Sequence, residues 1–571
     1  MTLSAKQQNS HPDRPIWWFL LCWTIFNIAQ AYRLEIHADE AYYWLYSKFL
    51  DWGYFDHPPM VAVFIWLGDH VMHNELGLRL VTILTSTASL YLLWQILKKY
   101  AVDAKTFILV VSGIFIFHIY GFITTPDAPL FFFTVLFYYV YQRYAEKDTW
   151  ALGVLIGVVA ACMLYSKYHA VLLIGFTVLS NIKLLKRESF WVAVIIAVGL
   201  YIPHISWQVT HNYPSINYHL YDRSASKYNP DNSLSYIPGQ LLMAGPLIGW
   251  LLFYRAWKVK ITDDFTRCLL VNAVGTFIFF FLSTFRGEAQ PHWTLIAFAP
   301  LAMLSLISLS GGQPLPKWFK ELAVINIAFI LFLRISIMFQ IPPIAWIGQI
   351  KSFYTFKKWA MNVNAKAGDS YVIMADGFQD PAKYSYYTNS TKGFSYDSRY
   401  YRLTQFDIWP IEDRLQHQRT YYMQDSPSRN TVDTIKTHNW TWYGEWVDDT
   451  RTYQKLSIDP GNYKVKLAPG QVQEFVLKIT NPYPYSIDFT NNKEKHAVAL
   501  DACFFKGEEL VTTTEADSTF NRVQIPQGGL ILFPFKVKAP QQKGEYDLLF
   551  SIITDPFAGG KNSRVIHCTI E

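Results

Sequence analysis

The sequence predicts a polytopic α-helical membrane protein with a polar, folded region at its C-terminal end. Hydrophobic residues make up 51% of the 571 positions and charged residues only 16%, whereas a soluble domain carries about a quarter charged residues. Apolar stretches long enough to cross a bilayer recur as far as position 340. The mean hydropathy of the whole chain is nevertheless only +0.10. A very apolar N-terminal part joined to a polar C-terminal part explains that average.

The apolar part divides into about eleven candidate spans. They cover positions 16–36, 77–97, 105–123, 127–143, 150–165, 168–184, 190–209, 236–256, 266–285, 290–309 and 318–339. The first stretch has an alternative interpretation as a cleaved signal peptide, because Ala29-Gln30-Ala31 resembles a small-residue cleavage site. The bulky side chains of Trp17, Trp18 and Trp23 favour a permanent span. We therefore expect a transmembrane domain over residues 1–340.

The loops between these stretches alternate in charge. One set is basic and contains Lys98, Lys99, Lys105, Arg143, Lys147, Lys183, Lys186, Arg187, Arg255, Lys258, Lys260, Arg267, Lys317 and Lys320. Because short cytoplasmic loops carry the excess of Lys and Arg, this set predicts a cytoplasmic N-terminus in a bacterial inner membrane. An odd number of spans then places everything after position 340 on the periplasmic side.

The polar C-terminal part changes character near position 450. Residues 341–450 mix helix-like and strand-like runs, such as Tyr371–Met374 followed by Asp376-Gly377, which predicts a small extracytoplasmic α/β segment. Residues 451–571 contain short alternating strands, at 463–467, 474–479, 497–505 and 530–538, separated by Gly-rich turns. This pattern is typical of an antiparallel, immunoglobulin-like β-sandwich. Its two cysteines, Cys503 and Cys568, either pair outside the cytoplasm or remain free and buried.

The most informative stretch is the loop predicted to follow the first span on the outer side. It reads His37-Ala-Asp39-Glu40-Ala-Tyr42-Tyr43-Trp44 and continues from Asp51 to Met60 through several aromatic residues. Two acids beside amphipathic aromatic residues indicate carboxylates held at the membrane interface. A purely structural role is the alternative, in which Asp39 and Glu40 only start an interfacial helix.

Other polar residues also cluster at the predicted outer ends of spans: Arg79, Asp127, Lys167, His169, His219, Arg223, Arg286 and His292. Each one alone is typical of a solvated helix end. Their collection on one side favours a single cavity that opens outward. Arg and Lys in such a cavity would hold a phosphate, and a carboxylate would accept a proton from an attacking hydroxyl.

Several of these segments together resemble a known family. The acidic pair Asp39-Glu40, Tyr54-Phe-Asp-His-Pro-Pro59, Thr125-Pro-Asp127, Ser166-Lys167-Tyr168 and Pro291-His-Trp293 are similar to bacterial members of glycosyltransferase family 39. That family includes the protein O-mannosyltransferases, is similar to the aminoarabinose transferases of lipid A, and belongs to the GT-C membrane superfamily. The resemblance covers roughly residues 15–425 and leaves out the β-sandwich.

The resemblance implies a GT-C fold and assigns roles at the matching positions. Asp39 would be the catalytic base and Glu40 would support it. Tyr54, Asp56 and His57 match a segment that reads Tyr-Phe-Glu-Lys-Pro in the aminoarabinose transferases, where the Lys binds the carrier phosphate. This chain departs from that pattern with His57, so Lys167 and Arg286 are the alternative phosphate partners on charge and placement. The further expected substrate-binding residues are Arg79, Asp127, His169, Arg223 and His292.

The implied reaction is an inverting transfer of sugar from a polyprenyl-phosphate donor to a lipid, glycan or protein of the envelope. The sequence lacks Walker-type and dinucleotide motifs and the His-Glu-x-x-His spacing, so we expect no cofactor and no metal. Basic residues scattered between apolar segments argue against nucleic acid as a partner, and membrane lipids are the expected surroundings. The alternative function is that of a lipid or solute transporter or flippase, whose ionisable residues would lie near the bilayer midplane.

Overall fold

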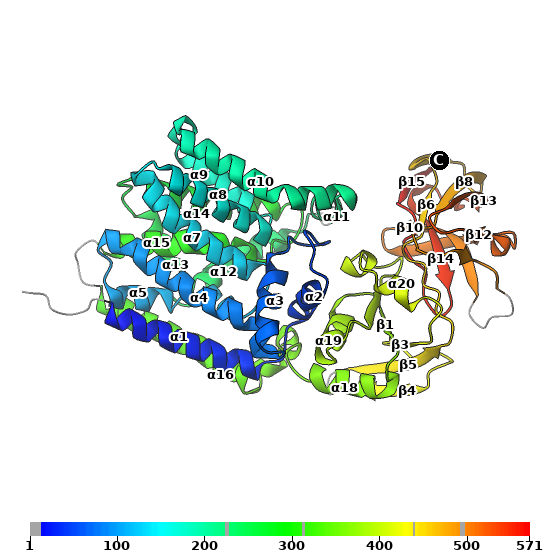
Figure 1. Ribbon diagram of the computed structural model, residues 1–571, viewed down its shortest axis with the longest axis horizontal. Coiled ribbons are helices and arrows are strands. Elements are labelled where there is room, and N and C mark those ends of the chain that lie inside the picture. The colour runs from blue at the N-terminus through cyan, green and yellow to red at the C-terminus, as the bar shows by residue number, and fades with distance from the viewer. Residues whose placement is uncertain (1–12, 223–227, 311–314, 438–439, 492–496) are drawn as a thin grey trace, which may run out of the picture. The chain divides into compact units, whose positions relative to one another are not determined.

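The computed structural model describes residues 13–222, 228–310, 315–437, 440–491 and 497–571. The chain forms two compact units, one ending at Tyr354 and the other running from Thr355 to Glu571. The first unit is helical and the second contains the strands (Figure 1). The predicted transmembrane domain, residues 1–340, lies within the first unit. From residue 355 onward, both predicted C-terminal segments belong to the second unit.

Each predicted apolar stretch contains helix. The longer helices of the first unit are α1 (Arg14–Arg33), α2 (Ala38–Lys48), α3 (Met60–Val71), α4 (Glu75–Leu97), α5 (Ala104–Val111), α6 (Phe115–Ile119), α7 (Asp127–Glu146), α8 (Trp150–Ser166), α9 (Ala170–Ser180), α10 (Glu188–Thr210), α12 (Pro230–Ala244), α13 (Gly249–Trp257), α14 (Asp264–Ser283), α15 (Leu295–Leu309) and α16 (Lys317–Met338). Stretch 105–123 is broken into α5 and α6. Stretch 236–256 is broken into α12 and α13, which meet at 92°.

Five helices in the described ranges are long and apolar enough to cross a membrane, or six if α12 and α13 count as one bent span. They are Glu75–Tyr100, Glu188–Thr210, Asp264–Ser283, Pro291–Leu309 and Lys317–Met338. Helices α3, α8 and α9 are apolar but shorter. The predicted count of about eleven spans therefore remains a prediction.

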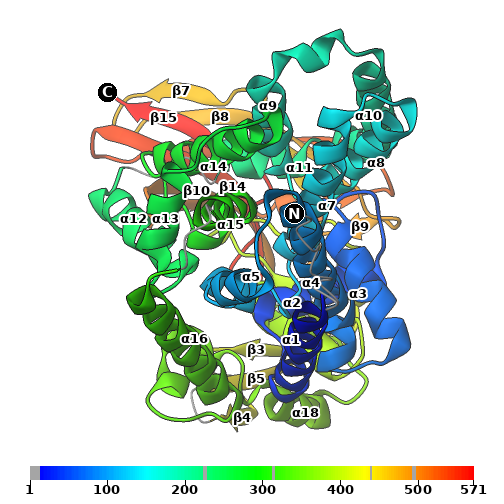
Figure 2. The same cartoon turned by 90° about the vertical axis from the view of Figure 1, so that its left-hand side faces the viewer.

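The helices differ strongly in how far protein surrounds them. For the span ending in α15, 78% of the apolar window is buried, because it packs against α7, α13 and α14 (Figure 2). Only 17% of the corresponding window of α10 is buried, since α10 packs mainly against α8. Helix α15 is thus the centre of the bundle, and α10 turns most of its apolar surface outward, where a membrane would place lipid.

One side chain of α16 forms hydrogen bonds to both helix breaks, the one between α5 and α6 and the one between α12 and α13. Asn326 is fully buried, and its Nδ2 donates to the carbonyl of Gly113 over 2.8 Å while its Oδ1 accepts from the N–H of Leu247 over 2.9 Å. Gly245 has a φ of +143°, and a Cβ there would lie 2.6 Å from the Gly113 carbonyl oxygen. Backbone groups freed by a break are costly in hydrocarbon unless they find partners. One amide side chain supplies partners for both breaks.

The second unit begins with a small α/β arrangement. Its sheet has the order β2-β1-β3-β5-β4 and comprises β1 (Val372–Ala375), β2 (Gly393–Tyr396), β3 (Thr420–Gln424), β4 (Asp433–Lys436) and β5 (Thr441–Val447). Strand β1 is parallel to β2 and β3, whereas β5 runs antiparallel to β3 and β4. Helices α18 (Phe356–Ala367) and α19 (Gln379–Tyr387) flank β1 in the chain. The predicted strand at 371–374 is therefore present.

Three further sheets in the described residues share one core in the rest of the unit. The larger two have the orders β11-β10-β14-β15-β7 and β13-β8-β6, and the third pairs β9 (Ile487–Asp488) with β12 (Gln524–Ile525). The strands of the larger two are β6 (Ser457–Asp459), β7 (Lys464–Leu467), β8 (Val472–Thr480), β10 (Val498–Lys506), β11 (Glu509–Glu515), β13 (Leu530–Lys538), β14 (Gly544–Thr554) and β15 (Ile566–Ile570). The core joins Leu477 and Phe535 of one sheet to Phe504 and Phe550 of the other. The four predicted strands match β7, β8, β10 and β13. The expectation of a wholly antiparallel sandwich was wrong, because β7 pairs with β15 in parallel.

A buried polar network links the two parts of this unit. Glu412, in α20 (Ile411–Leu415), accepts hydrogen bonds from the Thr452 hydroxyl over 2.6 Å and from the Gln454 N–H over 2.7 Å.

Cys503 and Cys568 lie on β10 and β15, and both are buried and free. Of the two alternatives for these cysteines, the structure therefore has the unpaired one.

Candidate active site

The first of the loops predicted to lie on the outer side turns into helix α2 at His37. The His37 Nδ1 accepts from the Asp39 N–H over 3.3 Å, and the His37 N–H donates to Glu40 Oε2 over 2.9 Å. These reciprocal bonds form a capping box, which fixes the start of the helix. The Asp39 side chain projects from this first turn and remains 41% exposed. The helix start thus presents one carboxylate outward and directs the other inward.

Glu40 is the inward carboxylate, and its partner is Arg79 of α4. Arg79 Nε donates to Glu40 Oε1 over 2.8 Å and Nη2 donates to Oε2 over 2.5 Å. Thr124 adds a backbone N–H to Oε1 over 2.9 Å. Burial alone would raise the pKa of Glu40, but the Arg79 charge and these hydrogen bonds hold it below its ordinary value. Glu40 is therefore a buried anion that fixes the start of α2, and its predicted support of a catalytic base remains a prediction.

The remaining donors of Arg79 bind the end of α1. Its Nη1 donates to the carbonyls of Ala31 and Leu34, and its Nη2 donates to that of Glu35, over 2.8–3.0 Å. All five guanidinium N–H groups are thereby used inside the protein. The expectation that Arg79 binds substrate was wrong, because this fully buried side chain has no donor left for a phosphate.

The aromatic loop after α2 is held around Asp56. Asp56 Oδ2 accepts from the hydroxyls of Tyr42 over 2.9 Å and Tyr46 over 3.3 Å, and its backbone carbonyl accepts from His219 Nε2 over 2.8 Å. The His57 ring lies 5.8 Å from that of Tyr43 and 6.0 Å from that of His219. Asp56 and His57 therefore belong to one cluster of phenols and imidazoles, and their binding of substrate remains a prediction.

Tyr54 has a different position from the one predicted. Its ring is fully buried and stacks on Tyr46, with the ring centroids 3.9 Å apart. Its hydroxyl donates to the carbonyls of Tyr46 and Phe49 and accepts from the Asp51 N–H. Because these backbone groups use the hydroxyl and protein covers the ring, the expectation that Tyr54 contacts substrate was wrong.

A second cluster forms where α7 begins. Asp127 accepts from Lys167 Nζ at both oxygens, over 2.8 and 2.9 Å, and the two side chains are 4% and 6% exposed. His292 Nε2 lies 4.0 Å from Asp127 Oδ2 and is 32% exposed. The structure thus brings these three predicted residues together. It also pairs the Lys167 ammonium with the Asp127 carboxylate, so the positive charge of Lys167 is already balanced within the protein.

Tyr120 lies beside this second cluster. Its ring is 6.0 Å from that of His292, whose Nε2 lies 4.0 Å from Asp127 Oδ2. Tyr120 was absent from the predicted set, although its place before Thr125-Pro126-Asp127 could have suggested it.

Tyr168 and His204 link the second cluster to the first. The His204 Nδ1 lies 2.7 Å from the Trp52 carbonyl, which can only accept, so Nδ1 carries the proton and Nε2 accepts from the Tyr168 hydroxyl over 3.2 Å. The Tyr168 ring lies 5.8 Å from that of His219. His204 was not predicted, although Ser206 and Gln208 follow it in α10 and could have marked this end of the helix as polar.

The other predicted residues lie around this region. His169 contacts the rings of Phe280 and Trp293, with centroids 4.9 and 5.8 Å away. Arg286 is exposed in the turn that follows α14. Arg223 lies outside the described residues. Within the described part of the chain, no group of three or more His, Cys, Asp or Glu side chains could hold a metal ion.

The chain is similar to several known proteins. Residues 56–207 match the family described as dolichyl-phosphate-mannose-protein mannosyltransferase. The lipid A galacturonosyltransferase RgtD of Rhizobium johnstonii is 21% identical over 320 residues, which are 52% of this chain and 65% of that protein. The match therefore spans slightly less than two thirds of that relative.

Solved structures show where the fold occurs elsewhere. ArnT from Cupriavidus metallidurans in the apo state superposes with a TM-score of 0.56 at 12% identity, covering 76% of this chain and 97% of ArnT. ArnT bound to undecaprenyl phosphate gives a TM-score of 0.54 over the same shares, also at 12% identity. This chain thus shares the fold of ArnT over 76% of its length.

Proposed function

We infer that this multi-pass membrane protein, a member of the GT-C superfamily, is a glycosyltransferase that takes its sugar from a polyprenyl-phosphate donor. The acceptor is a hydroxyl of a lipid, glycan or protein of the cell envelope. The reaction takes place at the outer face of a bacterial inner membrane, with the second unit in the periplasm. One observation carries the proposal: Asp39, a carboxylate that is 41% exposed, projects from a helix start that the buried Glu40–Arg79 ion pair fixes.

Asp39 is the proposed general base. It takes the proton from the acceptor hydroxyl, whose oxygen attacks the anomeric carbon as the bond to the carrier phosphate breaks on the opposite face, which inverts the configuration. A carboxylate performs this step when it can reach the hydroxyl, and the 41% exposure of Asp39 allows that approach. Glu40 is a positioning residue in this scheme, because it acts through the capping box and touches no substrate.

The leaving phosphate requires positive charge nearby, since stabilising the charge that develops in the transition state usually contributes most to the rate of such a reaction. Arg286 is exposed and is the leading candidate for that role. Lys167 is a weaker candidate because Asp127 already binds its ammonium. His57 and His219 lie 6.0 Å apart and would add hydrogen bonds to the phosphate. The structure of ArnT with undecaprenyl phosphate supports a donor of this chemical kind.

The test is transfer by membranes that contain the protein. Membranes are incubated with polyprenyl-phosphate sugar labelled in the sugar, with and without envelope extract, and released carrier phosphate is measured. We expect release that depends on the protein and on acceptor. Movement of intact donor across vesicles without release of carrier phosphate would instead establish the transporter alternative and overturn the proposal.

A further inference from the structure

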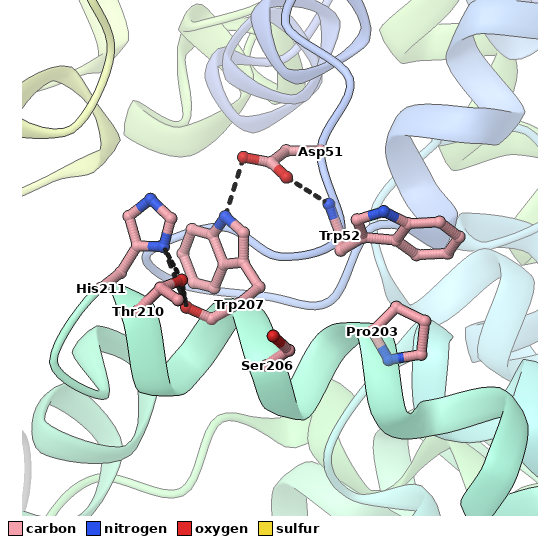
Figure 3. Close-up of a pocket in the computed structure, with 7 residues that line it drawn as sticks. All are labelled: Asp51, Trp52, Pro203, Ser206, Trp207, Thr210 and His211. Atoms are coloured by element: carbon pink, nitrogen blue, oxygen red, sulfur yellow. Dashed lines mark hydrogen bonds between the residues drawn. The ribbon is translucent and has the colours of Figure 1, made fainter.

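A groove opens between the loop that follows α2 and the outer end of α10. Its volume is about 410 Å³, and its lining comprises Asp51, Trp52, Pro203, Ser206, Trp207, Thr210 and His211 (Figure 3). This volume is in the range of clefts that bind small ligands. The lining includes none of the residues assigned above to donor or base, so the groove is a separate place on the same unit.

The loop and helix are fitted closely to one another at this groove. Asp51 Oδ2 accepts from the indole N–H of Trp207 over 2.8 Å, while Oδ1 accepts from the Trp52 N–H over 2.7 Å (Figure 3). A Cβ on Gly53 would lie 2.4 Å from Trp207 Cε3, so the loop backbone lies directly on the indole. These contacts fix the walls of the groove and leave the Trp52 side chain 56% exposed at its rim.

The side-chain groups that line the groove indicate which kind of ligand it binds. The lining combines the exposed Trp52 indole with a carboxylate, an imidazole and the hydroxyls of Ser206 and Thr210, and none of the seven residues is Lys or Arg. A phosphate would therefore meet the negative charge of Asp51 without a cation to offset it. A neutral or amino sugar suits these groups, because its hydroxyls pair with the polar atoms and its C–H face packs on the negative face of an indole.

Hydrogen bonds and one ring contact connect the groove to the proposed site. His204 donates to the Trp52 carbonyl and accepts from Tyr168, whose ring contacts that of His219. His219 in turn donates to the Asp56 carbonyl. Helix α10, which forms one wall, turns most of its apolar surface outward. A ligand anchored in the membrane could therefore reach the groove along α10.

We propose that the groove binds a neutral or amino sugar ring of a membrane-borne acceptor, an inference that rests on the proposed glycosyl transfer. The Trp52 indole would cover one face of the ring. The groups of Asp51, Ser206 and His211 would bind its hydroxyls, and an amino group, where present, would pair with Asp51.

Photolabelling of the full chain in lipid nanodiscs tests this subsite without requiring turnover. The probes are a diazirine derivative of methyl glucoside and a diazirine phosphatidylglycerol, and labelled peptides are mapped by mass spectrometry. We expect the sugar probe to label residues 51–52 and 203–211. Trp52→Ala should lower that labelling about fivefold or more, and Trp52→Phe should restore most of it, because it keeps an aromatic face. The matched control is Trp346→Ala, which removes another exposed tryptophan (62%) of the same unit outside the groove.

The outcomes separate the two proposals. Sugar-probe labelling that is unchanged in Trp52→Ala would overturn the sugar subsite. Labelling of the groove by the phosphatidylglycerol probe alone would also overturn it. Normal glycosyl transfer in the wild type together with no sugar labelling would overturn the subsite alone. Groove labelling in a protein that never releases carrier phosphate would overturn the transfer reaction instead, and with it the acceptor assignment.

Discussion

Arg79 donates two hydrogen bonds to the carboxylate of Glu40, and neither side chain is exposed. The pair ties α4 to the first turn of α2, from which Asp39 projects. Removing one partner from a buried pair costs about 3–5 kcal/mol, because the other charge stays buried without compensation. We therefore expect Arg79→Ala and Glu40→Gln each to lower the free energy of unfolding strongly, measured by denaturant unfolding in detergent.

The exposed pair of Lys317 and Glu321 supplies the control, since its side chains are 91% and 62% exposed. Lys317→Ala should change stability by less than about 1 kcal/mol. An Arg79→Ala protein of normal stability that had lost only donor affinity would contradict the structural role and return Arg79 to the phosphate site.

The helices of the first unit were predictable because a run of about twenty apolar residues is a local signal. The two breaks were not, since Gly113 and Gly245 stand inside apolar runs and Asn326, which binds both breaks, is 79 positions away from its partner in the nearer one. Likewise Asp39 stood out beside an aromatic segment. The ion pair of Glu40 with Arg79 depends on tertiary packing, so residue type and position suggested substrate binding by Arg79, whereas the fold uses Arg79 to hold Glu40.

The Lys167–Asp127 pair provides a second test of whether a predicted site residue stabilises the fold or binds the donor phosphate. Lys167→Met leaves the Asp127 carboxylate buried and uncompensated, and we expect a loss of about 3–5 kcal/mol in stability. Adding Asp127→Leu should restore most of it, because a neutral apolar pair needs no counter-charge. The complete double-mutant cycle is read by unfolding and, in parallel, by donor affinity. A single Lys167→Met variant that is stable but cannot bind polyprenyl-phosphate sugar would show that the lysine serves the phosphate.

Arg286 is expected to contribute to donor binding. A charge-assisted hydrogen bond to phosphate contributes about 1.5–3 kcal/mol, so Arg286→Ala should weaken binding of the polyprenyl-phosphate sugar about 10- to 100-fold while leaving folding intact. Arg267→Ala is the matched control, because Arg267 is an exposed arginine at the opposite end of the same helix, α14. Equal affinity in both variants would remove Arg286 from the site.

The second unit should lose stability as the pH rises. Burial raises the pKa of Asp397, and burial together with the neighbouring Asp397 charge raises that of Asp407. Thr404 holds the pair, donating its hydroxyl to Asp397 and its N–H to Asp407. A folded-state pKa above the unfolded value of 3.8 favours the protonated form. The stability contribution is therefore complete below about pH 4 and is lost as the pH rises through the raised values.

The measurement compares denaturant unfolding of the full chain at pH 5 and pH 8. Wild type should lose about 1.4 kcal/mol for each pKa unit of the shift that this range covers, and Asp407→Asn should flatten the dependence because it cannot ionise. Asp517→Asn, which changes an exposed aspartate of the same unit, should leave the dependence as it is. A profile identical in wild type and Asp407→Asn would show that the pair does not titrate in this range.

Asp39 decides the proposed reaction. Asp39→Asn keeps the size of the side chain and most of its hydrogen bonds but cannot accept a proton. Loss of a general base usually costs about 10²–10⁴-fold in rate, so we expect transfer at least about a hundredfold slower with donor affinity and stability unchanged. Glu288→Gln, an exposed acid in the turn after α14, is the control and should transfer normally. Near-normal transfer by a well-folded Asp39→Asn protein would reject the mechanism, and Asp56, which Tyr42 and Tyr46 bind, would become the next candidate base.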